Sequence, residues 1–396
     1  METGTVVILL TVGGILLLGL LANYLSPKLH IPRVTLLILA GVALGPSGFN
    51  ALPEGHEQWY TLFSNIALLM IGFILGCKLS FSALKDFGKQ VFYISIFEVL
   101  GVAALIFCGL MLLGVQIEVA LVLAGIGPAS APAAVTNVVE GMKAKGRFTD
   151  TLLGIVAIDD AWGLITFSVF LAVAVALSGS GGWVNALSTG GLELGGAILI
   201  GLLLGLPATW LTDHLRRGEP MQAEALGFIF ICGGLAQLIN ASFILATMIM
   251  GAVIANKSNH TDRAFDTIRE FEWPIMILFF VLAGSSLHIA KLPEIGLIGL
   301  IYIGLRIFGL VAGAYLGGSI SNAGKTIQKY MGMAITPQAG VALGMALVAK
   351  NHFPELEDTF IPLIIGTTVF FELIGPIFTR LALIKSDNAG KAENET

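Results

Sequence analysis

Long stretches without charge are the feature that most constrains this chain. Only 12% of its 396 residues are Asp, Glu, Lys or Arg, and 56% are hydrophobic. Soluble domains carry about 25% charged residues, whereas a bilayer core about 30 Å thick accepts helices of about 20 apolar residues. The sequence therefore predicts an all-α polytopic membrane protein and excludes a soluble enzyme. A net charge of −5 without a basic block also excludes nucleic acid as a partner.

Thirteen stretches are apolar enough to be interpreted as transmembrane spans. They cover residues 5–25, 32–50, 61–79, 90–113, 117–139, 149–178, 190–212, 224–240, 242–256, 273–289, 294–318, 329–349 and 359–384. Nearly all of the 21 Lys and Arg lie in loops after odd-numbered spans or in the tail; the exceptions are Lys291, Lys350 and the intramembrane Arg306. By the positive-inside rule, we expect the N-terminus outside and the C-terminus in the cytoplasm.

The two halves of the chain show a weak internal repeat. Three segments recur at a near-constant offset of about 206 to 210 residues: 30–41 with 240–251, 72–79 with 280–287, and 127–135 with 335–341. An odd number of intervening spans would invert the second copy, as in many secondary transporters. The predicted organisation is a first repeat (1–183), a linking span (184–222), a second repeat (223–385) and a cytoplasmic tail (386–396). The alternative is chance similarity between glycine-rich helices.

Spans five and twelve carry helix-breaking residues at corresponding positions: Gly127, Pro128, Pro132, Pro337 and Gln338. Proline removes a backbone donor, and a freed backbone group inside a membrane must line a cavity or find a partner. Paired discontinuous helices are a sequence indicator of a transport site. We therefore predict one discontinuous helix in each repeat.

Five ionisable residues lie well inside spans: Glu98, Asp159, Asp160, Arg306 and Glu372. A charge at the bilayer centre costs roughly 2.5–3.5 kcal/mol on insertion scales, so such residues are functional candidates. Four acids against one base indicate a site for cations.

Asp159 and Asp160 are the strongest candidates. Their mid-helix position argues against a helix-capping role, and adjacent helical residues point about 100° apart, so their roles would differ. Burial disfavours the charged form of a carboxyl group, and coupled acids titrate as a pair. Protons and metal cations can then compete for the same oxygens, which is a mechanism for exchange.

Arg306 needs a counter-ion, because it does not lose its proton in proteins. Glu98 occupies the corresponding position of the first repeat, so a core Glu98–Arg306 ion pair is the preferred prediction, and pairing of Arg306 with Asp159 is the alternative. Glu372 has no assigned role and could lie on the ion pathway, for which Thr136 and Thr336 are also candidates. The Cys and His spacings indicate no metal site, and no cofactor is expected.

These residues resemble those of the cation/proton antiporter superfamily, in its double-aspartate branch. The resemblance covers nearly the whole chain and is carried by Ala157–Gly163 with its Asp pair, the preceding broken helix, and Arg306 in span eleven. It implies a core domain (spans four to six and eleven to thirteen) that moves against a dimerisation domain (spans one to three and eight to ten) of a homodimer. It also implies that Asp160 binds the ion, that Asp159 assists and that Ser130 lines the site. We expect the cell membrane of a bacterium or archaeon as its location.

Two positions differ from the residues common in that superfamily. Ala131 stands where relatives often have a polar or acidic residue, and Arg306 stands where some have a lysine that can release a proton. The primary hypothesis is a Na⁺(Li⁺)/H⁺ antiporter in which Na⁺ and H⁺ compete for Asp159 and Asp160. A K⁺/H⁺ antiporter with the same site is the close alternative, and a sodium-coupled solute symporter is a more distant one.

Overall fold

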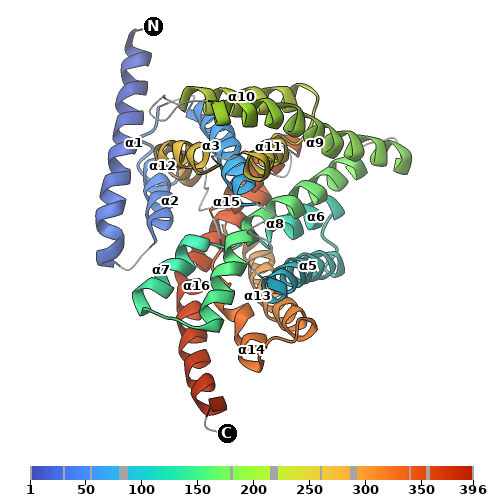
Figure 1. Ribbon diagram of the computed structural model, residues 1–396. Coiled ribbons are helices and arrows are strands. Elements are labelled where there is room, and N and C mark those ends of the chain that lie inside the picture. Colours follow the sequence, from blue (N-terminus) through green and yellow to red (C-terminus); the bar gives the residue numbers. More distant parts are fainter. Residues whose placement is uncertain are drawn as a thin grey trace.

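The computed structural model describes residues 2–29, 32–53, 56–79, 88–178, 182–214, 222–258, 261–285, 292–338, 340–353 and 357–394. Its helices (Figure 1) are α1 (Glu2–Leu29), α2 (Arg33–Leu44), α3 (His56–Lys78), α5 (Gly88–Leu112), α6 (Ile117–Ile126), α7 (Pro132–Met142), α8 (Arg147–Ser178), α9 (Gly182–His214), α10 (Gln222–Leu238), α11 (Phe243–Lys257), α12 (Thr261–Ser285), α13 (Leu292–Ile320), α14 (Lys325–Ala334), α15 (Val341–His352) and α16 (Glu357–Asn394). Among these residues the only extended pairing is an isolated antiparallel bridge between Ser130 and Gln338. The predicted all-α class is therefore confirmed.

Each predicted span contains helix, although the helix of span two ends at Leu44 and residues 286–289 of span ten lie outside the described residues. Six helices (α1, α5, α8, α9, α13 and α16) are long and apolar enough to cross a bilayer by themselves, and six of the other seven spans fall on shorter apolar helices. The remaining one, span twelve, falls on α14 and α15. The uncertain boundary between spans eight and nine lies at Asn240, whose φ of 53° ends one helix before Ser242 caps the next. Spans five and twelve are each divided into two half-helices, α6 and α7 in one and α14 and α15 in the other.

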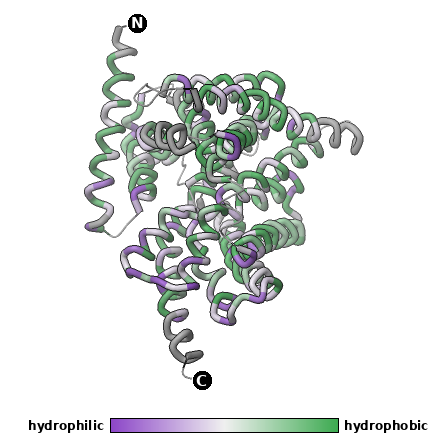
Figure 2. The backbone as a smooth tube through the Cα atoms, viewed as in Figure 1, coloured by the Kyte–Doolittle hydropathy of each residue, from purple (hydrophilic) through white to green (hydrophobic). Residues whose placement is uncertain are grey.

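The outward helix faces are apolar. Large side chains of α1, α9 and α10 are exposed, among them Leu10, Leu203, Trp210 and Ile231, and hydrophobic residues cover these helices in Figure 2. An exposed apolar surface of this extent is typical of a protein that lies in lipid.

Small residues set the closest helix crossings. A Cβ on Gly41 of α2 would lie 2.0 Å from the Val281 carbonyl oxygen of α12, and one on Gly76 of α3 would lie 1.9 Å from the Met248 carbonyl oxygen of α11. Helix α5 packs along α13 in a third crossing, where a Cβ on Gly309 would meet Val102 Cα at 2.6 Å. Only glycine permits backbones to approach so closely.

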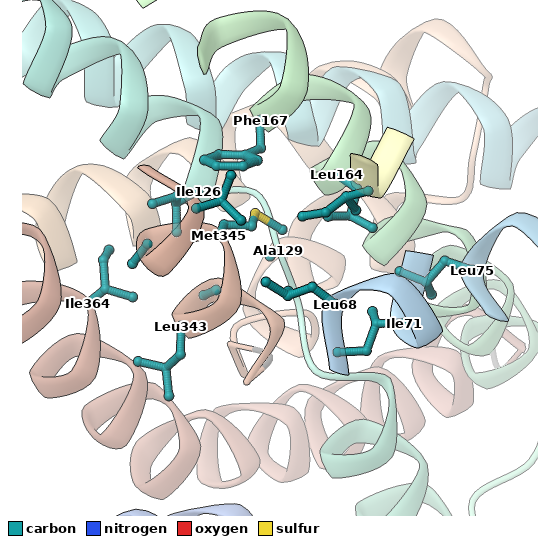
Figure 3. Close-up of a cluster of buried hydrophobic side chains, with 14 of the residues drawn as sticks. Leu68, Ile71, Leu75, Ile126, Ala129, Leu164, Phe167, Leu343, Met345 and Ile364 are labelled. Atoms are coloured by element: carbon teal, nitrogen blue, oxygen red, sulfur yellow. The ribbon is translucent and has the colours of Figure 1, made fainter. Parts of the chain in front are cut away.

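A cluster of apolar side chains separates α3 from the half-helices. Figure 3 shows Leu68, Ile71 and Leu75 of α3 facing side chains of α6, α8, α15 and α16, and all of these residues are buried. The middle of the molecule therefore has an apolar seam between α3 and the helices that carry the intramembrane charges.

Candidate ion-binding site at the crossed helix breaks

The two discontinuous helices cross at their breaks. Helix α6 ends at Ile126 and α7 starts at Pro132, where proline suits the first helical position because its missing N–H is not needed there. The two extended connections then pair, since Ser130 bridges Gln338 and the Ala131 N–H donates to the Pro337 carbonyl at 2.9 Å. The predicted breaks at Gly127–Pro132 and Pro337–Gln338 are therefore confirmed as positions where helix stops.

Neighbouring helices approach this crossing closely through glycine. A Cβ on Gly375 of α16 would lie 2.6 Å from Pro337 Cα, and one on Gly163 of α8 would lie 3.3 Å from Ala129 Cα. The hydroxyl of Thr379 donates to the Ala334 carbonyl at the end of α14 at 2.8 Å. Helix α8 therefore packs on one extended connection and helix α16 on the other.

Arg306 of α13 lies at the centre and is 0% exposed. Its Nε donates to the Gly127 carbonyl at 2.7 Å, its Nη1 to the Thr336 carbonyl at 2.7 Å, and its Nη2 to the Ala129 carbonyl at 3.0 Å. These carbonyls follow the C-terminal ends of α6 and α14, where helix dipoles are negative and backbone acceptors have no intrahelical donor. The guanidinium also lies 4.3 Å from the centroid of the Phe371 ring.

Glu98 of α5 does not form the direct ion pair expected with Arg306. The guanidinium is engaged by backbone carbonyls, and both oxygens of the fully buried Glu98 carboxyl lack a hydrogen-bond partner within the described ranges. The carboxyl of Glu98 instead lies against that of Asp159, close enough to Arg306 for the positive charge to act on it. The acceptors for Arg306 are backbone carbonyls at the helix breaks, and matching charged residues in the sequence cannot identify them.

Asp159 and Asp160 lie on α8 directly beside the break in α6–α7. Asp159 is 0% exposed and accepts a hydrogen bond from the Ser130 hydroxyl at Oδ2, whereas Asp160 is 6% exposed. The structure thus brings Asp159, Ser130 and Glu98 together at the break. Asp160 projects from the next position of the same helix, on a different face.

The remaining predicted residues occupy less central positions. The Thr336 carbonyl binds Arg306 while its hydroxyl donates to the Met333 carbonyl at 2.8 Å, so its side chain is satisfied within α14. Gln338 is buried and its Nε2 lies 3.5 Å from the Tyr302 hydroxyl. Thr136 is only half-buried on α7.

Glu372 of α16 contacts α2, while Phe371 and Gly375 of the same helix contact Arg306 and Pro337 at the crossing. The Thr35 hydroxyl donates to its Oε2, and the Thr35 backbone N–H also binds the carboxyl. Both residues are buried. The polar partner of Glu372 within the described residues is therefore Thr35 of α2 and not another of the intramembrane acids.

Four residues at these contacts escaped the sequence reasoning: Thr35, Tyr302, Phe371 and Gly375. Their residue types are ordinary in membrane helices, so only their three-dimensional neighbours distinguish them. A search for polar residues in the first three helical turns of each span would have flagged Thr35 and Tyr302.

Chemically, the site offers oxygen ligands and one fixed positive charge. Carboxylates, a hydroxyl and backbone carbonyls are hard ligands suited to alkali-metal cations rather than to transition metals. Within the part of the chain that the structure describes, no group of three His, Cys, Asp or Glu has the geometry of a resident metal site.

Comparisons with known proteins all match this chain to cation/proton antiporters. Residues 13–385 match the family model described as sodium/hydrogen exchanger, transmembrane. The chain is 22% identical over 356 residues to an ammonium/H⁺ antiporter subunit, AmhT, of Alkalihalophilus pseudofirmus, and the match covers 89% of each chain.

Two solved structures of MjNhaP1, a sodium proton antiporter from Methanocaldococcus jannaschii, have a similar fold. The structure at pH 8 superposes with a TM-score of 0.73 at 22% identity, covering 99% of this chain and 98% of that one. The electron-microscopy structure gives 0.66 at 19% identity, covering 96% and 95%. Because the family model spans almost the entire sequence, this chain belongs to the transmembrane sodium/hydrogen exchanger family of cation/proton antiporters.

Proposed function

We propose that this protein exchanges Na⁺ or Li⁺ for H⁺ by alternating access, with cation and proton competing for Asp160 and Asp159. The observation that carries the proposal is the crossing of two broken helices beside an Asp pair, with Arg306 engaged by the carbonyls of both breaks. Broken helices at mid-membrane supply both backbone ligands and mobility to transporters.

Asp160 is the better cation ligand of the pair. Asp159 accepts from Ser130 at Oδ2, lies against Glu98 and has a fully buried Oδ1, so it faces the protein interior. Asp160 retains 6% exposure against 0% for Asp159, so it is the less enclosed of the two carboxyls. In this proposal Asp160 binds the cation, Asp159 and Ser130 complete its environment, and a proton replaces the cation in the return step.

The proposed motion separates two groups of helices. Helices α5–α8 and α13–α16 would form the moving core, and α1–α3 and α10–α12 the dimerisation domain of a homodimer. The helix contacts have the symmetry that an inverted repeat would produce, because α2 packs on α12 as α11 packs on α3, and α5 packs on α13. The apolar seam of Figure 3 would let the core slide without breaking many polar contacts.

The test is a cation panel in proteoliposomes that contain the purified protein and a trapped pH dye. We expect Na⁺ and Li⁺ to drive proton movement in the wild type and Asp160→Asn to abolish it. Asp150→Asn is the matched control, because Asp150 is an exposed residue on the same helix. Full activity of Asp160→Asn would overturn the assignment of the site.

The same cation panel shows which cation the protein exchanges for protons. K⁺ and NH₄⁺ belong in it, since oxygen ligands select poorly among monovalent cations and the relative AmhT is described as an ammonium/H⁺ antiporter. Exchange driven by K⁺ but not Na⁺ would replace the proposed substrate while keeping the site.

A further inference from the structure

Glu372 of α16 has the same relation to the second helix break as Asp160 of α8 has to the first. Each acid lies three residues before the glycine that packs closely on its break, which is Gly375 in α16 and Gly163 in α8. Both acids are buried, Glu372 with 4% and Asp160 with 6% of its surface exposed. The packing therefore makes Glu372 the counterpart of the proposed cation ligand.

The residues directly before the two acids also occupy matching places. The Phe371 ring lies 4.3 Å from the Arg306 guanidinium, and Asp159 is close enough to Arg306 for their charges to interact. Adjacent helical positions point about 100° apart, so the following residue of each helix lies on another face. The charge of Arg306 accordingly acts on Asp159 but not on Glu372.

The contacts of Glu372 with α2 suit a negatively charged carboxylate. The Thr35 hydroxyl donates to Oε2, and the Thr35 backbone N–H, which can only donate, also binds the carboxyl. The first turn of α2 adds the positive end of a helix dipole. A buried carboxylate requires a positive partner. Within the described ranges the groups that act on Glu372 belong to Thr35 and include no basic side chain.

A buried hydroxyl without a partner lies one turn from Glu372 on the same helix. Thr368 is 0% exposed, and its Oγ1 makes no hydrogen bond to any described residue. The neighbouring Thr367 instead donates to the Ile364 carbonyl of its own helix at 3.3 Å. Positions four apart share a helix face, and a long side chain leans over the preceding turn. The Glu372 side chain is therefore directed toward Thr368.

We propose that Glu372, Thr35 and Thr368 form a second monovalent-cation site, which binds Na⁺ without releasing a proton. The carboxylate supplies the negative charge and the two hydroxyls supply neutral oxygens. A hydroxyl that donates to the carboxylate keeps its lone pairs for a cation, and hard oxygen ligands of this kind suit an alkali-metal ion. The inference rests on the proposed function, because Asp160 is the proposed ligand at the first break.

The first experiment counts the sites by equilibrium binding of radioactive Na⁺ to the purified protein. We expect two Na⁺ per chain in the wild type, one in Glu372→Gln and one in Asp160→Asn. Proton release on addition of NaCl should be unchanged in Glu372→Gln, because the second site holds no proton. Glu140→Gln is the matched control, since Glu140 is an exposed glutamate on α7, and it should bind two Na⁺.

The second experiment separates a cation site from a carboxyl that only binds the first turn of α2. Thr368→Val removes the hydroxyl without a partner and keeps the size of the side chain. It should raise the Kd of the second site at least fivefold and leave the site at Asp160 unchanged. Thr367→Val is the control, because the Thr367 hydroxyl is already bound within its own helix, and it should leave both affinities unchanged.

Two results would overturn the second site. One is a single Na⁺ per chain in the wild type that Asp160→Asn abolishes and Glu372→Gln retains. The other is an affinity of Thr368→Val equal to that of the wild type at both sites. Na⁺ binding that Asp160→Asn leaves undiminished would instead overturn the proposed function, so the two failures are distinguishable.

Discussion

Arg306 donates to backbone carbonyls of both discontinuous helices, and this makes it a structural centre of the site. A buried carbonyl that loses its donor destabilises a fold by about 1–3 kcal/mol. The guanidinium satisfies three of them at once in a planar fork that an ammonium group cannot reproduce. The charge of Arg306 therefore stabilises the crossing of the breaks directly, and acts on Glu98 and Asp159 only through space.

Replacing Arg306 by Lys should lower stability and activity together. A single ammonium group can reach one or two of the three carbonyls, so we expect a loss of about 2–4 kcal/mol in the free energy of unfolding. Thermal unfolding in detergent measures this loss. Arg380→Lys is the control, because Arg380 is exposed on α16; equal effects of the two substitutions would contradict the role given to Arg306.

A second prediction at the residue scale concerns Glu98. Glu98→Gln keeps a hydrogen-bond donor beside Asp159 and removes a group that can carry a second negative charge, so Asp159 can ionise without repulsion from its neighbour. Proton competition should weaken, so the KM for the transported cation at acidic pH should fall roughly threefold to tenfold. Cation-dependent exchange measured between pH 6 and 8 tests this; a raised KM at acidic pH would show that Glu98 assists cation binding instead.

The intramembrane charges could be found from sequence alone, but their partners could not. Glu98 and Arg306 occupy matching positions of the repeat predicted from the sequence, which favoured an ion pair between them. The acceptors that Arg306 uses are backbone carbonyls, created only when two helices stop and cross. Backbone groups carry no sequence signal of their own, and the contact of Glu372 with Thr35 joins residues far apart in the chain.

At the level of elements, the breaks and the glycine crossings could be predicted to different degrees. Proline and glycine marked where α6 and α14 end, because proline removes a backbone donor. Proline alone does not place a break, since Pro207, Pro274, Pro362 and Pro376 lie inside helices. The same composition does not say which glycines lie at a crossing. Gly41 meets a neighbouring backbone, whereas a Cβ on Gly234 of α10 would have no neighbouring atom of the described chain within 4 Å.

This contrast gives a prediction for helix packing. Gly41→Ala would place a Cβ 2.0 Å from the Val281 carbonyl oxygen, so α2 and α12 must separate. Overpacking of this kind typically lowers the free energy of unfolding by about 1–3 kcal/mol. Gly234→Ala should be neutral or slightly stabilising, since alanine favours helix over glycine. Thermal unfolding of both variants decides the matter, and equal midpoints would show that the crossing is not tight.

At the scale of the whole molecule, apolar composition and the distribution of cations together predicted the polytopic fold, and the family match confirms it. Short helices such as α2 could not be recognised as short, because the apolar stretch around them is longer than the helix itself. The core of the fold concentrates three acids and one base around two helix breaks, with the remaining intramembrane acid at the contact with α2. The proposed site of cation exchange is therefore the group of acids around the breaks.

The central claim is that cations and protons compete for the same carboxylates. The most direct measurement adds NaCl to purified, lightly buffered protein in detergent and records proton release with a pH dye. The account predicts saturable release in the wild type, matched against a choline chloride control, and none from Asp160→Asn. Undiminished release from Asp160→Asn, or Na⁺ binding by the wild type without any release of protons, would contradict it.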